Sequence, residues 1–289
     1  MTPVDFVEKN MREYKVQRGG NLVEYLLETD VELSFSALRK ALKKKDVKVR
    51  EKRVSADCPI CVGDTVRVYL PESAFCPPYD VTYLDENVII IDKHKGITTE
   101  SLATALEEKY SARPVHRLDR NTAGLLVFAR NEQSEKELLS AFKHRTVKKV
   151  YLAEVYGEME KTHGEYVDYL VKNAEKSTVK VYAEKTSGGD VIKTAWEVQG
   201  KGKYGTIVRI TLHTGKTHQI RAHFAYHGHF VVGDGKYGKE AFNRMAKQKT
   251  QRLLAYELVF SFADGSLSYL NGKTFTSSQT QVIFDENKG

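Results

Sequence analysis

Short segments in which apolar and polar residues alternate recur between residues 79 and 262, and only scattered stretches have helical periodicity. The alternation is clearest in residues 148–157 (KKVYLAEVYG) and 205–215 (GTIVRITLHTG), and residues 252–262 (RLLAYELVFSF) form a late segment of the same kind. A period of two is typical of strands that bury one face. A doubly wound sheet would need strands and helices in regular alternation, which this chain lacks. The pattern therefore predicts a protein of the α+β or mixed class.

The first 70 or so residues have a different pattern and predict a small unit of their own. Residues 22–30 (LVEYLLETD) carry an apolar stripe with helical spacing. Ser34 is placed to cap a second helix in residues 35–45 (FSALRKALKKK). Residues 47–54 (VKVREKRV) and 63–70 (GDTVRVYL) are expected to form two short strands. The order of these elements indicates a compact α+β module.

A proline pair in residues 75–80 (FCPPYD) marks a linker after this module. The 289 residues suffice for one small and one large domain, and we expect these at residues 1–74 and 75–289. No apolar run approaches the roughly 20 residues that span a bilayer. Residues 1–10 lack the basic and apolar regions of an export signal. We therefore expect a protein that is neither inserted in a membrane nor exported.

Basic residues are concentrated in residues 39–53 of the small module. This window contains nine of them and two acidic residues, a surplus of seven that equals the net charge of +7 of the whole chain. Such a concentration favours a polyanionic partner, although a charged run can also be no more than the solvated face of a helix. The nine basic residues are Arg39, Lys40, Lys43, Lys44, Lys45, Lys48, Arg50, Lys52 and Arg53.

The three cysteines are Cys58, Cys61 and Cys76, and their odd, low number favours a reducing compartment, so we expect a cytoplasmic protein. Cys58 and Cys61 form a C-x-x-C motif. A zinc site would need two further ligands at suitable spacing, and the sequence has no second C-x-x-C. We therefore interpret the cysteines as structural thiols, with metal binding and redox activity as the less favoured alternatives.

One acidic residue, Asp119, stands among cationic residues in residues 115–124 (VHRLDRNTAG), directly before a buried strand. If this stretch is extended, Arg117 and Asp119 share one face. A neighbouring arginine would keep the carboxylate ionised. A charged carboxylate in a cleft can act as a nucleophile, but the same residues can also form a structural ion pair. From this stretch alone the structural pair is favoured.

The segment 214–223 (TGKTHQIRAH) invites two interpretations that its spacing does not support. A phosphate-binding loop needs a glycine where this chain has Ile210. His223 and His227 have helical spacing, but no H-E-x-x-H motif or carboxylate partner accompanies them in the sequence. We therefore expect neither a nucleoside triphosphate site nor a metal site here.

Four motifs follow one another along the chain: HRLDRNTAGLL (116–126), KVYLAEVYG (149–157), TGKTHQIRAH (214–223) and GDGKYG (233–238). Alone, Tyr151 would be a packing residue and the glycines of the last motif a turn. In this order, the motifs resemble those of the RluA-like family of RNA pseudouridine synthases, over roughly residues 79–262. Ala123 replaces a common serine, and His94 stands where the family has the proline of a Lys-Pro-x-Gly motif. The resemblance implies the pseudouridine synthase fold, α+β with a mixed, largely antiparallel central sheet.

The N-terminal module resembles the S4 RNA-binding domain, a frequent partner of this family. The match rests on the leucine stripe, Ser34 and Ser36, the strand at Val47, and the Gly63-Asp64 turn. An arginine common in the first helix of that domain is missing, and Asp46 stands where a glycine is common. The resemblance implies that this module binds RNA through a basic surface formed by Arg39, Lys40, Lys43, Lys44 and Lys48.

The family resemblance also implies roles for single residues. Asp119 is then the nucleophile, and Arg221 pairs with it and positions it. Tyr151 is expected to stack on the target base and to assist proton transfer. Arg117 would fill the space that a flipped uridine leaves.

We therefore expect an isomerase that converts specific uridines in structured RNA, rRNA or tRNA, to pseudouridine after base flipping. The reaction needs no cofactor and no metal, because it has no redox or hydrolytic step, and we expect a monomer. The alternative is a non-catalytic RNA-binding or assembly factor that retains the fold. Such a factor would be expected to lose Asp119, Tyr151 and Arg221, and all three are present.

Overall fold

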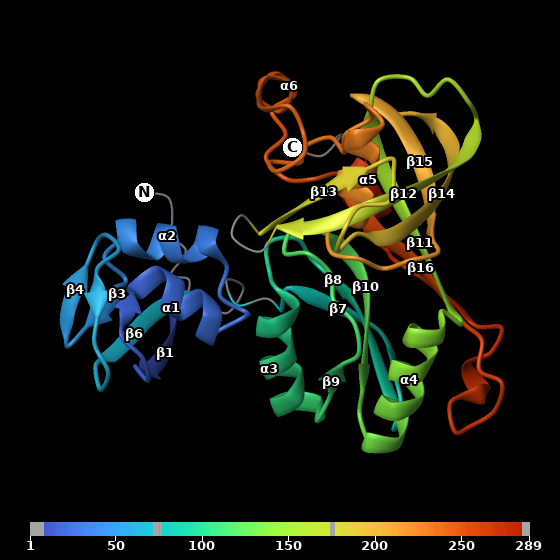
Figure 1. The fold of residues 1–289 in the computed structure, drawn as a ribbon. Helices are drawn as coiled ribbons and strands as arrows, with labels where there is room; N and C mark the ends of the chain where they lie inside the picture. Colours follow the sequence, from blue (N-terminus) through green and yellow to red (C-terminus); the bar gives the residue numbers. More distant parts are fainter. Residues whose placement is uncertain (1–8, 72–74, 76, 174–176, 285–289) are drawn as a thin grey trace, which may run out of the picture. The chain divides into compact units, whose positions relative to one another are not determined.

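The computed structural model describes residues 9–71, 75, 77–173 and 177–284, and the chain divides into two compact units, Met1–Pro78 and Tyr79–Gly289 (Figure 1). The division falls four residues after the domain boundary expected at residue 74. Cys76 and most residues of that expected boundary lie outside the described residues. The two units are described separately below.

The N-terminal unit contains two helices and a four-stranded antiparallel sheet in the order β1-β6-β3-β4. Its elements are β1 (Lys9–Lys15), β2 (Gly20–Asn21), α1 (Leu22–Thr29), α2 (Phe35–Lys43), β3 (Val47–Val49), β4 (Lys52–Val54), β5 (Pro59–Ile60) and β6 (Thr65–Pro71). The Ser34 side chain accepts a hydrogen bond from Ala37 N at 3.1 Å, so the predicted cap of α2 is confirmed. Leu22, Leu26 and Leu38 are fully buried between helices and sheet.

The prediction of a single strand in residues 47–54 is wrong, because these residues form the hairpin β3–β4. Arg50 and Glu51 both have positive φ, of 50° and 65°. A two-residue hairpin turn requires this conformation, and glycine or asparagine usually supplies it. Because neither turn residue is of that type, the sequence carried no turn signal at this place.

The second unit is built on a mixed sheet of 11 strands, in which only β10 and β16 pair in parallel among the described strands. The strands follow the order β13-β12-β14-β15-β11-β16-β10-β8-β7, with β17 beside β16 and β9 beside β10. The predicted mixed, largely antiparallel sheet is thus confirmed. The bounds are β7 (Tyr79–Leu84), β8 (Val88–Lys93), β9 (Arg113–Pro114), β10 (Ala123–Ala129), β11 (Val147–Tyr156), β12 (His163–Asn173), β13 (Thr178–Tyr182), β14 (Asp190–Lys201), β15 (Gly205–Leu212), β16 (Leu253–Phe260) and β17 (Thr274–Thr276).

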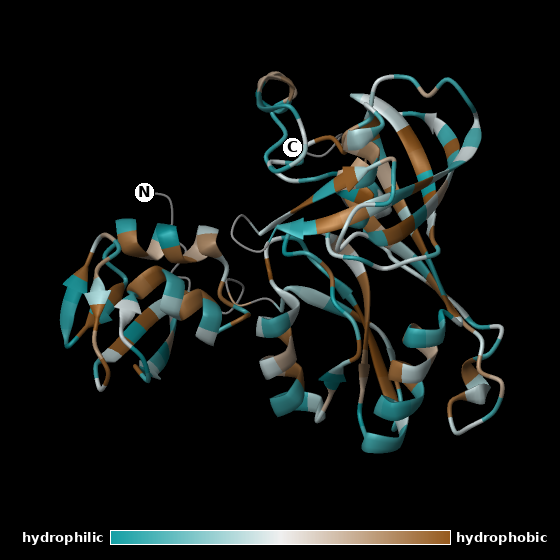
Figure 2. Cartoon of the chain, in the orientation of Figure 1, coloured by the Kyte–Doolittle hydropathy of each residue, from teal (hydrophilic) through white to brown (hydrophobic). Residues whose placement is uncertain are grey.

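Hydrophobic residues are concentrated along these strands (Figure 2). Every residue of β8 and β10 is buried, as expected for central strands covered on both faces. Gly124 at the start of β10 has a φ of +112°, and a Cβ atom there would lie 2.2 Å from Ala255 O. A glycine is therefore required for the parallel approach of β10 to β16, directly after the segment that contains Asp119.

The helices of this unit are α3 (Thr99–Tyr110), α4 (Glu132–His144), α5 (Gln219–Tyr226), α6 (Glu240–Met245) and α7 (Thr280–Phe284), with a short 3₁₀ turn at Ser268–Leu270. Residues 132–145 (EQSEKELLSAFKHR) predict a helix that Asn131 caps, with Leu138, Leu139 and Phe142 facing inward. Asn131 does cap α4, by accepting from Ser134 N at 2.9 Å. Leu139, which was expected to face inward, is instead exposed, whereas Leu138 is buried. Helix α3 and strand β12 had not been predicted. Among the described residues, none of the helices combines the length and apolar composition that a bilayer-spanning helix requires.

Helix α5 packs against β12, β13 and β14 at one end of the sheet. Helix α4 packs against β10 near the other end. Figure 1 shows α3 and α4 beside the β7–β8–β10 part of the sheet and α5 beside the β12–β14 part. The motif residues that the sequence singled out lie on β11, on α5 and in the loops around them.

Candidate active site

Asp119 lies in an irregular segment between β9 and β10, and hydrogen bonds fix this segment at both sides of the residue. The backbone N–H of Leu118 donates to Thr99 Oγ1 at 3.1 Å, and the same hydroxyl donates to Leu118 O at 3.2 Å. Thr122 N donates to Asp119 O at 3.0 Å. Because Leu118 is buried and Asp119 is 22% exposed, the carboxylate is held at the boundary between core and solvent.

Arg221 in α5 forms an ion pair with Asp119, as the sequence had suggested. Its Nη1 donates to Asp119 Oδ2 at 2.7 Å. Its Nε and Nη2 donate to the two oxygens of Asp234 at 2.6 and 2.9 Å. Burial alone would lower the pKa of Arg221, but the hydrogen bonds and negative charges of Asp234 and Asp119 outweigh burial and raise it. The arginine therefore stays charged between two carboxylates.

Asp234 is fully buried in the loop 233–238, the fourth family motif, whose glycines alone predicted no more than a turn. Burial raises the pKa of its carboxyl group, but Arg221 and two backbone N–H groups outweigh this and lower it. The N–H groups belong to Lys236 and Tyr237. Gly233 has a φ of +80°, and a Cβ atom there would meet Thr250 O at 2.1 Å. The glycine thus allows the loop to place Asp234 behind Arg221.

His218 is a neighbour of Asp119 that sequence reasoning did not assign. It precedes α5 in a left-handed conformation, with a φ of 54°, and its Nε2 lies 3.8 Å from Asp119 Oδ1. Its Nδ1 lies 2.8 Å from the hydroxyl of Tyr237, which also accepts from Val179 N at 2.9 Å. The hydroxyl proton is therefore available to Nδ1, and a neutral His218 carries its proton on Nε2, toward Asp119. Burial lowers the pKa of His218, against the opposing charge of Asp119.

Tyr151 on β11 is buried and lies beside the same carboxylate. The pairing of β11 with β16 shifts register between Val150 and Tyr151. The extra residue of this bulge is Tyr256 in β16, opposite the step from Val150 to Tyr151. Burial raises the pKa of the Tyr151 phenol, and the charge of Asp119 adds to the effect, so the phenol is protonated at neutral pH.

These side chains line an open pocket with a cavity volume of about 140 Å³. One part of its wall is apolar and consists of Leu118, Tyr151, Leu212, Ile220 and Leu253. Asp119, His218 and Arg221 supply the polar part. A flat, partly apolar group that presents polar edges would fit such a wall.

A second pocket also contains Asp119 in its lining and is rich in cations. It shares Arg117, Leu118, Asp119, His218 and Arg221 with the first pocket. Its further basic residues are Arg120, Lys236 and Lys249. Asp119 thus lines both a partly apolar pocket and a basic one, an arrangement suited to a base in the first and a phosphate backbone in the second.

Arg117 does not pair with Asp119, although the extended conformation assumed from the sequence would have placed the two side by side. The residues between β9 and β10 are irregular, so the strand alternation does not hold there. The Arg117 guanidinium lies 3.5 Å from Glu100, and both side chains are exposed. It remains available to a ligand at the rim shared by both pockets.

Lys93, at the end of β8, is a fully buried lysine within electrostatic range of Asp119. Its Nζ donates to the carbonyl oxygens of His94, Ile97 and Arg120 at 3.0 to 3.1 Å. It thereby ties the loop after β8 to the residue that follows Asp119. Burial lowers the pKa of Lys93 to about 7, while the charge of Asp119 acts in the opposite direction.

The basic residues of the N-terminal unit lie on the face of α2 that points away from its core and on the adjacent strand β3. Arg39, Lys40, Lys43 and Lys44 are exposed, and Lys48 is partly exposed. The Arg39 guanidinium lies 5.6 Å from the ring centre of Phe35, an exposed aromatic residue on the same helix. Cations interleaved with an exposed aromatic ring are suited to nucleic acid.

The only group of side chains in the described part of the chain that is arranged like a metal site lies outside both pockets. It consists of Asp168, His223 and His227. The sequence showed the helical spacing of the two histidines but not their carboxylate, because Asp168 comes from β12, 55 residues before His223.

Known proteins similar to this chain point to one family. Residues 86–226 match the family model described as RNA pseudouridylate synthase. The ribosomal large subunit pseudouridine synthase C of Vibrio cholerae is 30% identical over 240 residues, which are 74% of this chain and 75% of that protein. Its counterpart in Escherichia coli K12 is 27% identical, over 78% of each chain. The solved structure of human RNA Pseudouridylate Synthase Domain Containing 1 has a TM-score of 0.57 and 25% identity, over 71% of this chain and 93% of that one.

Fold, site and similarity together define an enzyme that modifies RNA by isomerisation. The chain belongs to the RluA-like family of RNA pseudouridine synthases. Its reaction is the conversion of uridine in RNA to pseudouridine. The expectation of an isomerase is thus confirmed against the alternative of a non-catalytic factor.

Proposed function

We propose that Asp119 is the nucleophile of this pseudouridine synthase and that ribosomal RNA of the large subunit is its substrate. The observation that carries the first part is the position of the Asp119 carboxylate: it is partly exposed, lines two pockets and is bound on one oxygen by the buried Arg221. The substrate is inferred from relatives named ribosomal large subunit pseudouridine synthase C, of which this chain spans about three quarters or more.

The reaction breaks the bond between N1 of uracil and the ribose and rejoins the ribose to C5. Asp119 attacks the nucleotide and holds it while the base turns, and the carboxylate is released when the ribose is joined to C5. The proton that C5 loses is balanced by the one that N1 gains. Arg221 holds the carboxylate in a fixed direction, because the guanidinium is itself fixed by Asp234. Tyr151 stacks on the base from the apolar wall, and its protonated phenol serves proton transfer at the turning base. No cofactor or metal is needed for these steps.

A uridine has to leave its stack to reach Asp119, which costs a few kcal/mol. Arg117 at the exposed rim fills the space that the flipped base leaves. The basic pocket with Arg120, Lys236 and Lys249 receives the phosphates next to the target nucleotide. Contacts to phosphate position the RNA, while the shape of the partly apolar pocket selects the base.

The N-terminal unit acts as an S4-like RNA-binding domain in this proposal. Its basic surface, formed by Arg39, Lys40, Lys43, Lys44 and Lys48, contacts RNA phosphates. The exposed Phe35 beside Arg39 adds a ring on which an unpaired base can stack. We place the enzyme in the cytoplasm as a monomer, in keeping with its ribosomal substrate and with the free thiols of Cys58 and Cys61.

The proposal is tested by incubating the protein with transcripts of large-subunit rRNA, small-subunit rRNA and tRNA. Pseudouridine is then mapped by chemical modification and reverse-transcription stops. We expect new sites in large-subunit rRNA, and none with Asp119→Asn, which keeps the size of the side chain but removes its charge. Pseudouridine sites confined to tRNA would contradict large-subunit rRNA as the substrate. Sites that still form with Asp119→Asn would contradict Asp119 as the nucleophile.

A further inference from the structure

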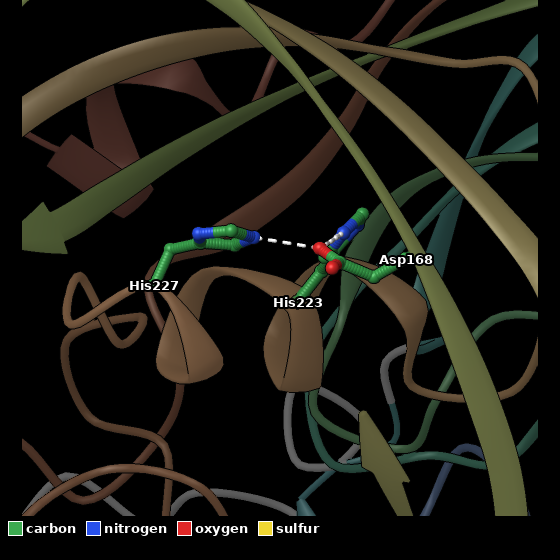
Figure 3. A group of neighbouring side chains, drawn as sticks. All are labelled: Asp168, His223 and His227. Carbon is green, nitrogen blue, oxygen red and sulfur yellow. Dashed lines mark hydrogen bonds and ion pairs between the residues drawn. The ribbon is translucent and has the colours of Figure 1, made fainter. Parts of the chain in front are cut away.

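Asp168, His223 and His227 form a compact group that the isomerisation does not use. Asp168 comes from β12, His223 lies in α5, and His227 is the residue that ends this helix. Figure 3 shows both imidazole rings directed at one carboxylate. The Nε2 atoms of His223 and His227 lie 2.8 and 2.7 Å from Asp168 Oδ2, and the possible ligand atoms are all within 4.8 Å of one another. None of the three residues lines either pocket near Asp119.

Among the described residues, the buried carboxylate of Asp168 has no lysine or arginine as an ion-pair partner. Within the described part of the chain, its ion pairs are only with the two histidines, which are charged only when protonated. Asp168 is 5% exposed, and a buried carboxylate is costly unless a cation or several hydrogen bonds compensate its charge. The site therefore has a net negative charge when both histidines are neutral, which is the state in which imidazole binds a metal.

Both rings are held in place by neighbours that leave their Nε2 atoms directed at the carboxylate. Thr194 Oγ1 lies 2.9 Å from His223 Nδ1 and is itself bound by Gln219 Nε2. The His227 ring is stacked on Tyr166, with 3.8 Å between ring centres and 6° between planes. A histidine that binds a metal through one ring nitrogen usually donates the N–H of its other ring nitrogen to a polar partner, which fixes the orientation of the ring. The neighbours of His223 thus match those of a metal ligand.

We propose that Asp168, His223 and His227 bind one divalent transition-metal ion of the Zn²⁺ class. Two imidazole nitrogens and one carboxylate suit Zn²⁺ and its neighbours in the first transition series, whereas Mg²⁺ and Ca²⁺ prefer sites made of oxygen atoms. Three protein ligands leave a fourth position for water, on the side of the partly exposed His227.

The geometry is close to that of a metal site. Ligand bonds of about 2.1 Å in tetrahedral geometry place ligand atoms roughly 3.4 Å apart. The two nitrogens would therefore have to move away from Asp168 Oδ2 by about 0.6 Å for His223 and about 0.7 Å for His227. The bound ion would tie β12 to α5, the helix that also contains Arg221. It would thus stabilise the element that positions Asp119 without taking part in the reaction.

The test is titration of the metal-free full-length protein, without an affinity tag, with Zn²⁺ by calorimetry and with Co²⁺ by visible absorption. The protein carries Cys58→Ser, Cys61→Ser and Cys76→Ser, because thiols also bind these ions. We expect calorimetry to give one Zn²⁺ ion per chain, and Co²⁺ to show the visible absorption bands of a site with low coordination number. The midpoint temperature of thermal unfolding should rise by about 5 °C at saturating Zn²⁺. Absence of binding at tens of micromolar protein would overturn the proposal.

His227→Gln is the decisive variant, because glutamine can still donate a hydrogen bond to Asp168 but is a poor ligand for these ions. Its side chain is partly exposed, so the variant is expected to fold, which circular dichroism without metal verifies. We expect its Zn²⁺ affinity to fall by roughly 100-fold or more. His229→Gln, two residues further along and outside the group, is the matched control and should bind as the unchanged protein does. Equal affinity of His227→Gln and the control would show that the group is a hydrogen-bonded cluster only.

Discussion

Arg221 Nη1 lies 2.7 Å from Asp119 Oδ2, and the opposite edge of the same guanidinium is bound by both oxygens of Asp234. Asp119 and Arg221 are 102 residues apart in sequence. The planar fork of arginine allows one side chain to contact two carboxylates in fixed directions. The buried Asp234 thereby determines where the exposed Asp119 points.

Arg221→Lys tests this geometry. Lysine keeps the positive charge but cannot make the three directed hydrogen bonds, so Asp119 should lose its fixed direction. We expect kcat to fall by about 100-fold, the effect of a displacement near 1 Å, with a smaller change in KM. Single-turnover kinetics on an RNA substrate measures this. The control is Arg209→Lys, which alters the pair of Arg209 with Glu257, outside both pockets, and should leave kcat within about twofold of its original value. Equal losses in both variants would contradict the positioning role.

Asp234→Asn should destabilise the second unit. The substitution keeps the size of the side chain but removes the negative charge of Asp234. This charge offsets most of the free-energy cost of burying the Arg221 guanidinium. Removing one member of a buried ion pair typically costs about 3–5 kcal/mol of unfolding free energy, which urea titration measures. Asp190→Asn, which breaks the exposed pair of Asp190 with Lys216, should cost no more than about 1 kcal/mol. Similar values for the two variants would show that Asp234 contributes only hydrogen bonds.

Two substitutions of Tyr151 separate stacking from proton transfer. Tyr151→Phe keeps the ring, so the Kd for RNA should be unchanged, while loss of the phenol should lower kcat by about 100-fold or more. Tyr151→Leu removes the ring as well, and should also weaken binding by about 1–3 kcal/mol, the typical contribution of one stacked base. Filter binding and single-turnover rates measure the two quantities. Unchanged kcat in Tyr151→Phe would leave stacking as its function.

The sequence was sufficient to predict the elements with strong local signals. Asn131 before an apolar helical stripe predicted α4, and alternating residues predicted β11, β15 and β16. The family motifs indicated that Asp119, Tyr151 and Arg221 share one site, and the three residues line the same pocket although they lie on a loop, a strand and a helix.

Features that depend on tertiary contacts could not be predicted. His218 lies near Asp119 only because it takes a left-handed conformation before α5, and no residue type in TGKTHQIR signals this. Asp168 meets His223 only through the packing of α5 on β12. Leu139 faces solvent because two neighbouring leucines on a helix point about 100° apart, and the core accommodates only Leu138.

Lys93 should make stability depend on pH. Its pKa is lowered by burial to about 7 in the folded protein, from the ordinary value of 10.5. Between these values the unfolded chain binds one more proton than the folded chain, so stability rises as pH increases from 7 toward 10. Below pH 7 this contribution is at its minimum. Lys93→Met, which fills a similar volume without a charge, should lack the rise.

The difference is measured by urea unfolding of both proteins between pH 6 and 9. The free energy of unfolding of the unchanged protein should gain about 2 kcal/mol relative to Lys93→Met over this range. If the three carbonyl oxygens that accept from Nζ keep the ammonium charged, the two curves will run parallel. That result would show that hydrogen bonding outweighs burial at this lysine.

The basic surface of the N-terminal unit should determine how RNA affinity responds to salt. Each lysine that neutralises a phosphate adds roughly 0.7–0.9 to the slope of log K against log salt concentration. Lys40→Ala/Lys43→Ala on α2 should therefore reduce the slope by about 1.5 and weaken binding of all RNA sequences alike. The matched control is Lys136→Ala/Lys143→Ala, a pair of exposed lysines on α4. Both double variants lose the same net charge, so a general effect of charge predicts equal slopes, whereas a specific RNA surface on α2 predicts a reduced slope for the first variant only.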